Sequence, residues 1–204
     1  VGASYVNTWL PVACGAQMVE YWLFRAHPNG HELAHGALFN TAGRPYRVTQ
    51  EIAQAAQEFG RCAAFLADSR VSLDIALHYS STVVKECEYA PMLQDFNYRK
   101  MLIERFHRPL RGHNVDVIET AHALDGYKVV ISPFLFTSDE HELPARIEAW
   151  VKEGGTWIVG PMSDIMTEYA SKYTDKPHSF LEELAGVYET YDLPIGNSVY
   201  RARW

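Results

Sequence analysis

The sequence predicts an α/β protein in which a parallel, doubly wound sheet follows a single strand-helix unit. Short apolar segments with strand-like composition recur along the chain, and helical patterns separate them. Strands that alternate with single helices form parallel sheets with helices on both faces. The alternation restarts after Asp68. We therefore predict two domains, residues 1–67 and residues 68–204.

The first region contains one predicted strand and one long predicted helix. The run MVEYWLF, residues 18–24, has the length and aromatic content of a buried strand. A helix is predicted to begin near Tyr46, after Gly43 and Pro45. Its apolar stripe is Val48, Ile52, Ala55, Phe59, Ala63 and Leu66. One such unit cannot cover both faces of a sheet, so we expect the end of a larger domain.

The second region has four predicted strands, at residues 71–79, 115–119, 127–134 and 156–160. A helix at residues 93–109 separates the first two strands. Another helix precedes the last strand, with a T-x-x-E capping box at Thr137 and Glu140 and a left-handed stop at Gly154. Its apolar face is Leu143, Ile147, Trp150 and Val151. This order predicts a parallel sheet.

Composition excludes several classes of function. The net charge is −7 and there is no basic run, so nucleic acid is not an expected partner. No apolar run approaches the roughly 20 residues of a membrane span, and the first residues do not resemble a signal peptide. We expect a soluble, cytoplasmic protein. The three cysteines lack a CxxC pair and predict reduced packing residues, neither disulfide nor zinc ligands.

The stretch GHELAHGAL, residues 30–38, carries the candidate binding residues. Glu32 and His35 are three residues apart, so they share one side of a helical turn. A carboxylate that accepts hydroxyl protons beside an imidazole suits a sugar with adjacent hydroxyls. A helix-start acid with a surface histidine would have the same spacing. Upstream, Trp22 and Phe24 either form a flat wall for a sugar ring or pack in the core.

A catalytic centre is not visible in the sequence. Glycoside hydrolysis needs two positioned carboxyl groups, and none of the other acids pairs convincingly with Glu32. Cys87 lies in KECEY, which lacks the glycines of a nucleophile elbow. We interpret the second region as a non-catalytic α/β module with aromatic residues suited to contact with another chain.

The order of these features resembles the glycoside hydrolase family 42 β-galactosidases over almost the whole chain. The first stretch that carries the resemblance is VACGAQMVEYWLFRAHPNGHELAHGALFNTAGRPYRVTQEI, which includes the spacing from the strand to Glu32, His35 and GRPYRV. The other two are VDVIETAHALDGYKVVISPFLF and RIEAWVKEGGTWIVGPMSD in the second region.

The resemblance implies a retaining β-galactosidase that hydrolyses terminal non-reducing β-D-galactosyl residues. By it, residues 1–67 are strand 8, loop and helix 8 of a (β/α)8 TIM barrel. Residues 68–204 are the trimerisation domain, a flavodoxin-like, class I glutamine amidotransferase-like module that builds a homotrimer. Glu32 and His35 correspond to the residues that bind galactose hydroxyls. Trp22 stands where the family commonly has a phenylalanine that lines the same subsite.

The resemblance also implies that no catalytic residue belongs to this segment. The family's acid/base and nucleophilic glutamates, and its cysteine metal site, lie on parts upstream of Val1. We therefore expect the isolated segment to be inactive and to hold no metal or other cofactor. A non-catalytic oligomerisation or interaction module is the alternative from another class. A stand-alone amidotransferase-like enzyme is a third hypothesis, and it requires a reactive cysteine.

Overall fold

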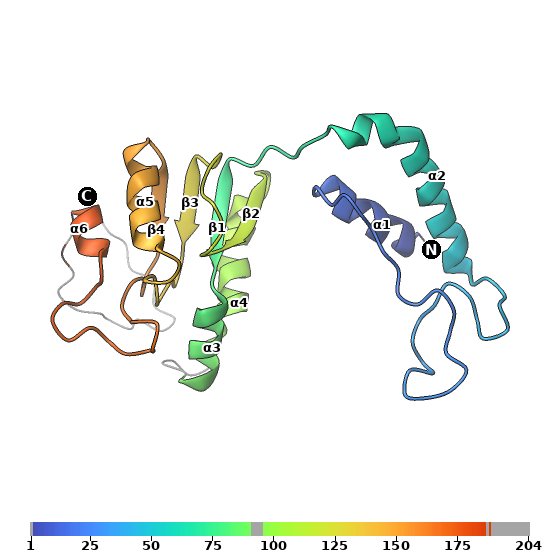
Figure 1. The fold of residues 1–204 in the computed structure, drawn as a ribbon, viewed down its shortest axis with the longest axis horizontal. Coiled ribbons are helices and arrows are strands. Elements are labelled where there is room, and N and C mark those ends of the chain that lie inside the picture. The colour runs from blue at the N-terminus through green and yellow to red at the C-terminus, as the bar shows by residue number, and fades with distance from the viewer. Residues whose placement is uncertain (1, 91–95, 187, 189–204) are drawn as a thin grey trace. The chain divides into compact units, whose positions relative to one another are not determined.

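The computed structural model describes residues 2–90, 96–186 and 188 of the 204-residue chain. The chain divides into two compact units, Val1–Ser72 and Leu73–Trp204 (Figure 1). The N-terminal unit contains two helices, α1 (Ala3–Ala13) and α2 (Arg47–Ala67), which pack against each other. Helix α2 confirms the helix predicted to begin near Tyr46, which is its N-cap residue. Residues 14–46 connect the helices without a regular strand.

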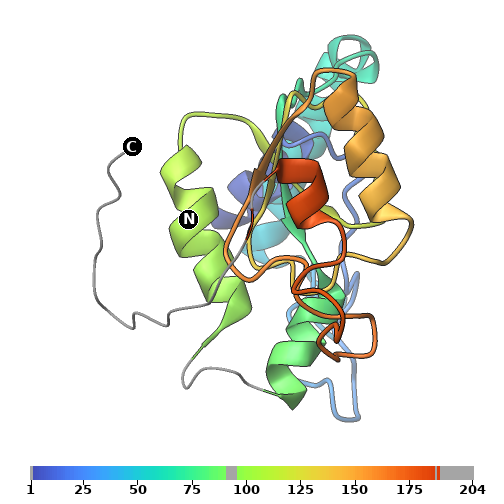
Figure 2. The same cartoon turned by 90° about the vertical axis from the view of Figure 1, so that its left-hand side faces the viewer.

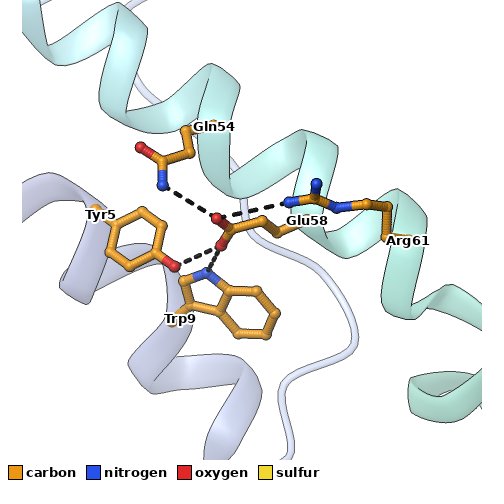
Figure 3. Close-up of polar contacts among 5 residues, drawn as sticks. All are labelled: Tyr5, Trp9, Gln54, Glu58 and Arg61. Carbon is orange, nitrogen blue, oxygen red and sulfur yellow. Dashed lines mark hydrogen bonds and ion pairs between the residues drawn. The ribbon is translucent and has the colours of Figure 1, made fainter.

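Two glutamates on different turns of α2 accept hydrogen bonds from the α1 region. The Glu51 carboxylate accepts hydrogen bonds from the Gly2 and Ser4 amides, at 3.0 and 3.2 Å, and so caps the start of α1. Glu58 accepts from the Tyr5 hydroxyl and from the Trp9 indole, the latter at 3.1 Å (Figure 3). Helix α1 was not predicted from the sequence. Its N-cap position is a glycine, and the groups that cap it come from a distant helix.

The strand predicted at residues 18–24 is wrong. These residues form no strand, and the side chains of Trp22 and Phe24 are 78% and 69% exposed. Pairing in this unit is confined to isolated bridges that join Arg25 to Phe39 and Phe39 to Pro45. A strand needs a neighbour along its length, and the described residues of this unit supply none. Leu23 alone in the run is buried.

The described part of the C-terminal unit contains a four-stranded parallel sheet with the order β2-β1-β3-β4. The strands are β1 (Ile75–Tyr79), β2 (Val115–Glu119), β3 (Val129–Ser132) and β4 (Thr156–Val159). Leu77 in the centre of β1 pairs with Val117 on one side and Ile131 on the other. All four predicted strands are therefore confirmed. Three are shorter than predicted, because their outer residues belong to connecting loops.

Helical segments cover both faces of this sheet (Figure 2). Helix α5 (Leu143–Lys152) packs through Leu143 and Ile147 on Ala76 and Val130. The opposite face carries Leu77 and Ile131, which contact the helical residues 102–110. Neighbouring residues of a strand point to opposite faces, so Ala76 and Leu77 belong to different layers. The C-terminal unit is thus an α/β fold with an all-parallel sheet.

The remaining helices of this unit differ from the sequence analysis. Helix α3 (Ser81–Tyr89) was not predicted, although Ser80 caps it by accepting the Val83 amide at 3.1 Å. The predicted helix at 93–109 corresponds to three consecutive helical segments. They are α4 (Tyr98–Met101), a wider π-helix at Leu102–His107 and a tighter 3-10 helix at Arg108–Leu110. The first residues of the predicted helix lie outside the described ones. A short α6 (Leu181–Ala185) follows β4.

The predicted capping box of α5 is wrong. Helix α5 begins later, and its N-cap residue is Glu142 with φ +54°. The Thr137 hydroxyl instead donates to Glu86 at 2.6 Å, and Glu140 accepts from the Thr82 hydroxyl at 2.7 Å. Both residues therefore bind α3, an element that the local pattern could not show. The predicted stop at Gly154 is confirmed by its φ of +104°.

Candidate functional site

The candidate site lies on a loop whose two ends are bonded to each other. The Leu38 amide donates to the Leu23 carbonyl at 3.1 Å, and the Phe39 amide donates to the Phe24 carbonyl at 2.9 Å. In return the Ala26 amide donates to the Phe39 carbonyl at 2.8 Å. Residues 27–37 therefore form a loop whose two ends are held together. The loop has a fixed base even though most of its side chains are exposed.

Glu32 and His35 lie together in this loop. The His35 amide donates to the Glu32 carbonyl at 3.0 Å, which closes a turn and brings the two side chains to the same side. Oε2 of Glu32 lies 3.8 Å from Nδ1 of His35. The two side chains are 48% and 54% exposed, so both are open to a ligand. The pair offers an acceptor beside an imidazole, as the spacing predicts.

The structure adds His27, which the sequence analysis missed. Nε2 of His27 lies 3.0 Å from Oε2 of Glu32, nearer than His35 does. The five-residue separation from Glu32 matches no helical or strand spacing, so the pattern gave no reason to pair them. The available signal was the X-Pro step at His27 and Pro28, which indicates an extended or turning backbone.

Trp22, the third predicted site residue, is placed at the entrance of the loop. Its side chain is exposed, and among the described residues no hydrogen bond or ring contact joins it to Glu32 or His35. Phe24, two residues on, packs its ring against Phe39 with 4.8 Å between the ring centroids. The aromatic pair supports the base of the loop, and Trp22 is left as an open aromatic surface.

Comparison with known protein families gives this geometry its context. The family model described as β-galactosidase, of glycoside hydrolase family 42, matches residues 1–62, and the model of the β-galactosidase trimerisation domain matches residues 74–197. The second match alone covers more than half of the chain. This chain belongs to the glycoside hydrolase family 42 β-galactosidases. The family resemblance expected from the sequence is confirmed.

Individual relatives agree with the family assignment. The β-galactosidase YesZ of Bacillus licheniformis is 30% identical over 191 residues, which are 90% of this chain and 28% of that protein. YesZ of Bacillus subtilis is 27% identical over 192 residues, with 92% and 28% covered. The solved β-galactosidase of Halorubrum lacusprofundi is 26% identical with a TM-score of 0.72, covering 90% of this chain and 27% of that one. The chain thus spans about 28% of the length of these curated relatives.

Glycoside hydrolysis requires a pair of carboxyl groups, and four other acids of this family 42 chain are engaged in structural contacts. Glu58 and Glu51 are held by the α1 contacts, and these hydrogen bonds lower the pKa of both groups. Asp164 is buried and accepts from the Phe180 and Leu181 amides at 2.7 and 2.9 Å, so it caps α6. Burial raises the pKa of Glu86, which is bonded to Thr137. These acids have structural partners.

Two further findings concern ligands and membranes. Within residues 2–90, 96–186 and 188, no group of three or more His, Cys, Asp or Glu side chains is arranged to hold a metal ion. Over the same residues, no helix has the length and apolar character needed to cross a bilayer. The loop places the imidazoles of His27 and His35 beside the Glu32 carboxylate, and the exposed indole of Trp22 lies at its entrance.

Proposed function

We propose that this chain is part of a retaining β-galactosidase that hydrolyses terminal non-reducing β-D-galactosyl residues. The observation that carries the proposal is the closed loop that gathers Glu32 and His35 in a segment that matches the β-galactosidase family model. Curated relatives bearing the name β-galactosidase match about nine tenths of the chain. The segment binds the sugar, while the reaction is carried out by groups outside it.

The site residues have separate roles in this proposal. The Glu32 carboxylate accepts protons from galactose hydroxyls, and the His35 imidazole donates to or accepts from a neighbouring hydroxyl. Trp22 forms an apolar wall against the C–H side of the sugar ring. A hydrogen-bond acceptor, an imidazole that can donate or accept, and a flat aromatic ring match a pyranose better than they match an anion or an apolar ligand.

The two regions take the domain roles implied by the family. Residues 1–67 take the place of strand 8, its loop and helix 8 of a TIM barrel, where binding groups gather in loops after the strands, although residues 18–24 are not paired as a strand in this chain by itself. The exposed apolar side chains of Met18, Trp22 and Phe24 support this, since a barrel would cover several of them. Residues 68–204 form the trimerisation domain, and their strand order β2-β1-β3-β4 supports a flavodoxin-like, doubly wound sheet. The assembled enzyme is a homotrimer.

The catalytic pair is contributed by residues outside this chain. Retention requires a nucleophilic carboxylate and an acid/base carboxylate about 5 Å apart, and positioning groups cannot replace them. The 204-residue chain alone is therefore inactive, and it needs no metal or other cofactor. The enzyme works in the cytoplasm. Turnover of a chromogenic β-galactoside by the purified chain would contradict this assignment of roles.

The decisive experiment uses the full-length protein to which the chain belongs. Glu32→Gln should lower kcat/KM for a chromogenic β-galactoside by about 10- to 100-fold, because a charged hydrogen-bond acceptor is lost. Glu153→Gln, at the exposed end of α5, is the matched control and should leave kcat/KM within about twofold. Equal effects of the two substitutions would contradict a sugar-binding role for Glu32.

Oligomerisation without catalysis is the second candidate, favoured by the trimerisation-domain match at residues 74–197. Sedimentation of the full-length protein tests this role separately. Three copies are expected whether or not the protein hydrolyses galactosides. A trimer that does not hydrolyse galactosides would leave assembly as the function. A monomer would rule out the oligomerisation role.

A further inference from the structure

His27 contacts Glu32 from the fixed base of the loop. We propose that His27 is a positioning residue that holds Oε2 of Glu32, so that Oε1 of Glu32 and the imidazole of His35 bind the sugar. The inference rests on the proposed function, because it assigns a role within the same galactose site. It adds His27 to Glu32, His35 and Trp22, the three residues that the family resemblance implies.

The backbone around His27 is restrained on both sides. The preceding residue, Ala26, is buried and its amide bonds the Phe39 carbonyl at 2.8 Å. The following residue, Pro28, has a fixed φ and confines His27 to extended conformations. Glu32, in contrast, lies in an exposed turn in the middle of the loop. His27 can therefore orient Glu32, whereas the exposed turn offers no comparable anchor.

The two imidazoles contact the same carboxylate oxygen at different distances. Nε2 of His27 is shielded from solvent and lies 3.0 Å from Oε2 of Glu32, within ion-pair distance, but it has no hydrogen-bond partner among the described residues. Nδ1 of His35 is 3.8 Å away, which exceeds hydrogen-bond length. A buried ring nitrogen this close to a carboxylate oxygen needs only a small rotation of Glu32 to bond it, so His27 is the imidazole placed to hold the carboxylate and His35 is left to turn toward a ligand.

Holding one oxygen affects substrate binding more than the chemical step. A carboxylate fixed before the sugar arrives does not have to lose its rotational freedom on binding. Removing His27 should thus raise KM for a β-galactoside and change kcat less. A side chain that only fills space at position 27 would not produce this split.

The test measures kcat and KM of the full-length protein with a chromogenic β-galactoside. His27→Leu and His27→Ser each remove the nitrogen at Oε2 and should raise KM about tenfold, with kcat changed less than about threefold. His27→Gln keeps an N–H donor at a similar reach and should restore KM to within about threefold of the unsubstituted protein. His31→Leu, a histidine of the same loop next to Glu32, is the matched control and should behave like the unsubstituted protein.

A double-substitution cycle shows whether His27 acts through Glu32. In the Glu32→Gln background, His27→Leu should raise KM less than about twofold, because the group that His27 holds has already changed. Thermal melting of each variant confirms that it is folded, and His27→Ser decides the outcome if His27→Leu does not fold.

The possible results separate this inference from the proposed function. An unchanged KM in folded His27→Leu or His27→Ser overturns the positioning role while hydrolysis by the unsubstituted protein supports the function. An equal rise with His31→Leu, a failure of His27→Gln to restore KM, or full additivity with Glu32→Gln also overturns the positioning role. Lack of any hydrolysis by the unsubstituted full-length protein overturns the proposed function itself.

Discussion

The N-terminal and C-terminal units differ in how much of their side-chain surface they bury for themselves. Among the described residues of the N-terminal unit, the buried ones are Thr8, Leu23, Ala26 and Ala55. The C-terminal unit has three packed apolar clusters, one on each face of its sheet and one built from residues that follow the strands. A sheet covered on both faces supplies its own core, whereas two helices joined by a long loop bury few side chains. The difference indicates that the N-terminal unit needs additional contacts to become rigid.

The largest expected effect contrasts a buried with an exposed apolar residue. Leu77→Ala, at a fully buried position of β1, should lower the free energy of unfolding of the C-terminal unit by about 3 kcal/mol. Phe65→Ala, at a 79% exposed position of α2, should change the stability of the 204-residue chain by less than about 0.5 kcal/mol. Urea denaturation followed by circular dichroism measures both. Similar losses would contradict the difference between the units.

The next contrast is the acid sensitivity of the C-terminal unit. Burial lowers the pKa of His78 from 6.5 to about 4, with smaller contributions from the Arg146 and His122 charges. As the pH falls, His78 is protonated near pH 6.5 in the unfolded state but only near pH 4 in the folded state. The free energy of unfolding therefore falls by about 3 kcal/mol between pH 6.5 and pH 4. His78→Asn should flatten this part of the profile, measured as unfolding midpoint against pH.

The N-terminal unit should lose its contacts in a more acidic range. The hydrogen bonds from α1 lower the pKa of Glu51 and Glu58 below their ordinary 4.5. Their contribution is present above the ordinary pKa and is lost as pH falls through the lowered folded value. Amide chemical shifts of α1 in NMR spectra of the 204-residue chain measure this loss, and a change that begins above pH 5 would argue against this order.

Glycine substitutions should have opposite signs in the two units. A Cβ at Gly160 would lie 2.6 Å from the Pro133 Cα, so Gly160→Ala should destabilise the C-terminal unit by about 1–3 kcal/mol. Gly60 in α2 has open space around it, and Gly60→Ala should stabilise that helix by about 0.5–1 kcal/mol. Thermal melting of the two variants gives both signs. Destabilisation by Gly60→Ala would indicate unrecognised packing there.

The smallest expected effect concerns the thiols. Burial raises the pKa of the Cys87 thiol to about 11, whereas Cys14 is exposed. Since the thiolate is the reactive form, iodoacetamide should modify Cys14 at least about tenfold faster than Cys87 in the folded chain. Peptide mapping after timed alkylation measures both rates. Rapid modification of Cys87 would revive the hypothesis of an amidotransferase-like nucleophile.

The sheet could be predicted from sequence more fully than the N-terminal unit. Strand β2 spans the predicted residues 115–119. A short apolar run bounded by turn residues is typical of a buried strand, so this element could be predicted. The run at 18–24 is also short and apolar, but it lacks strand partners in the described part of its unit. Pairing is a property of neighbouring strands, so apolar composition alone gave the wrong structure there.

Other differences arise where distant contacts replace local ones. Thr137 and Glu140 have capping-box spacing, but their side chains bond to Glu86 and Thr82 on another helix. For the candidate site, Glu32 and His35 were predictable because a turn brings residues three apart together. His27 was not, since its contact depends on the path of the whole loop. Cys14 is exposed, unlike the packing residue predicted for it.

The paired backbone bonds at the base of the loop also bear on how such a segment can vary in length. Because Leu23, Phe24 and Ala26 are bonded directly to Leu38 and Phe39, the chain enters and leaves the loop at fixed points. Doubling the length of a flexible loop between fixed ends costs only about 0.6 kcal/mol of closure entropy. Insertions or grafted segments between His31 and Gly36 would thus change which ligand the loop binds. Leu38, Phe39 and the following helix α2 would keep their places.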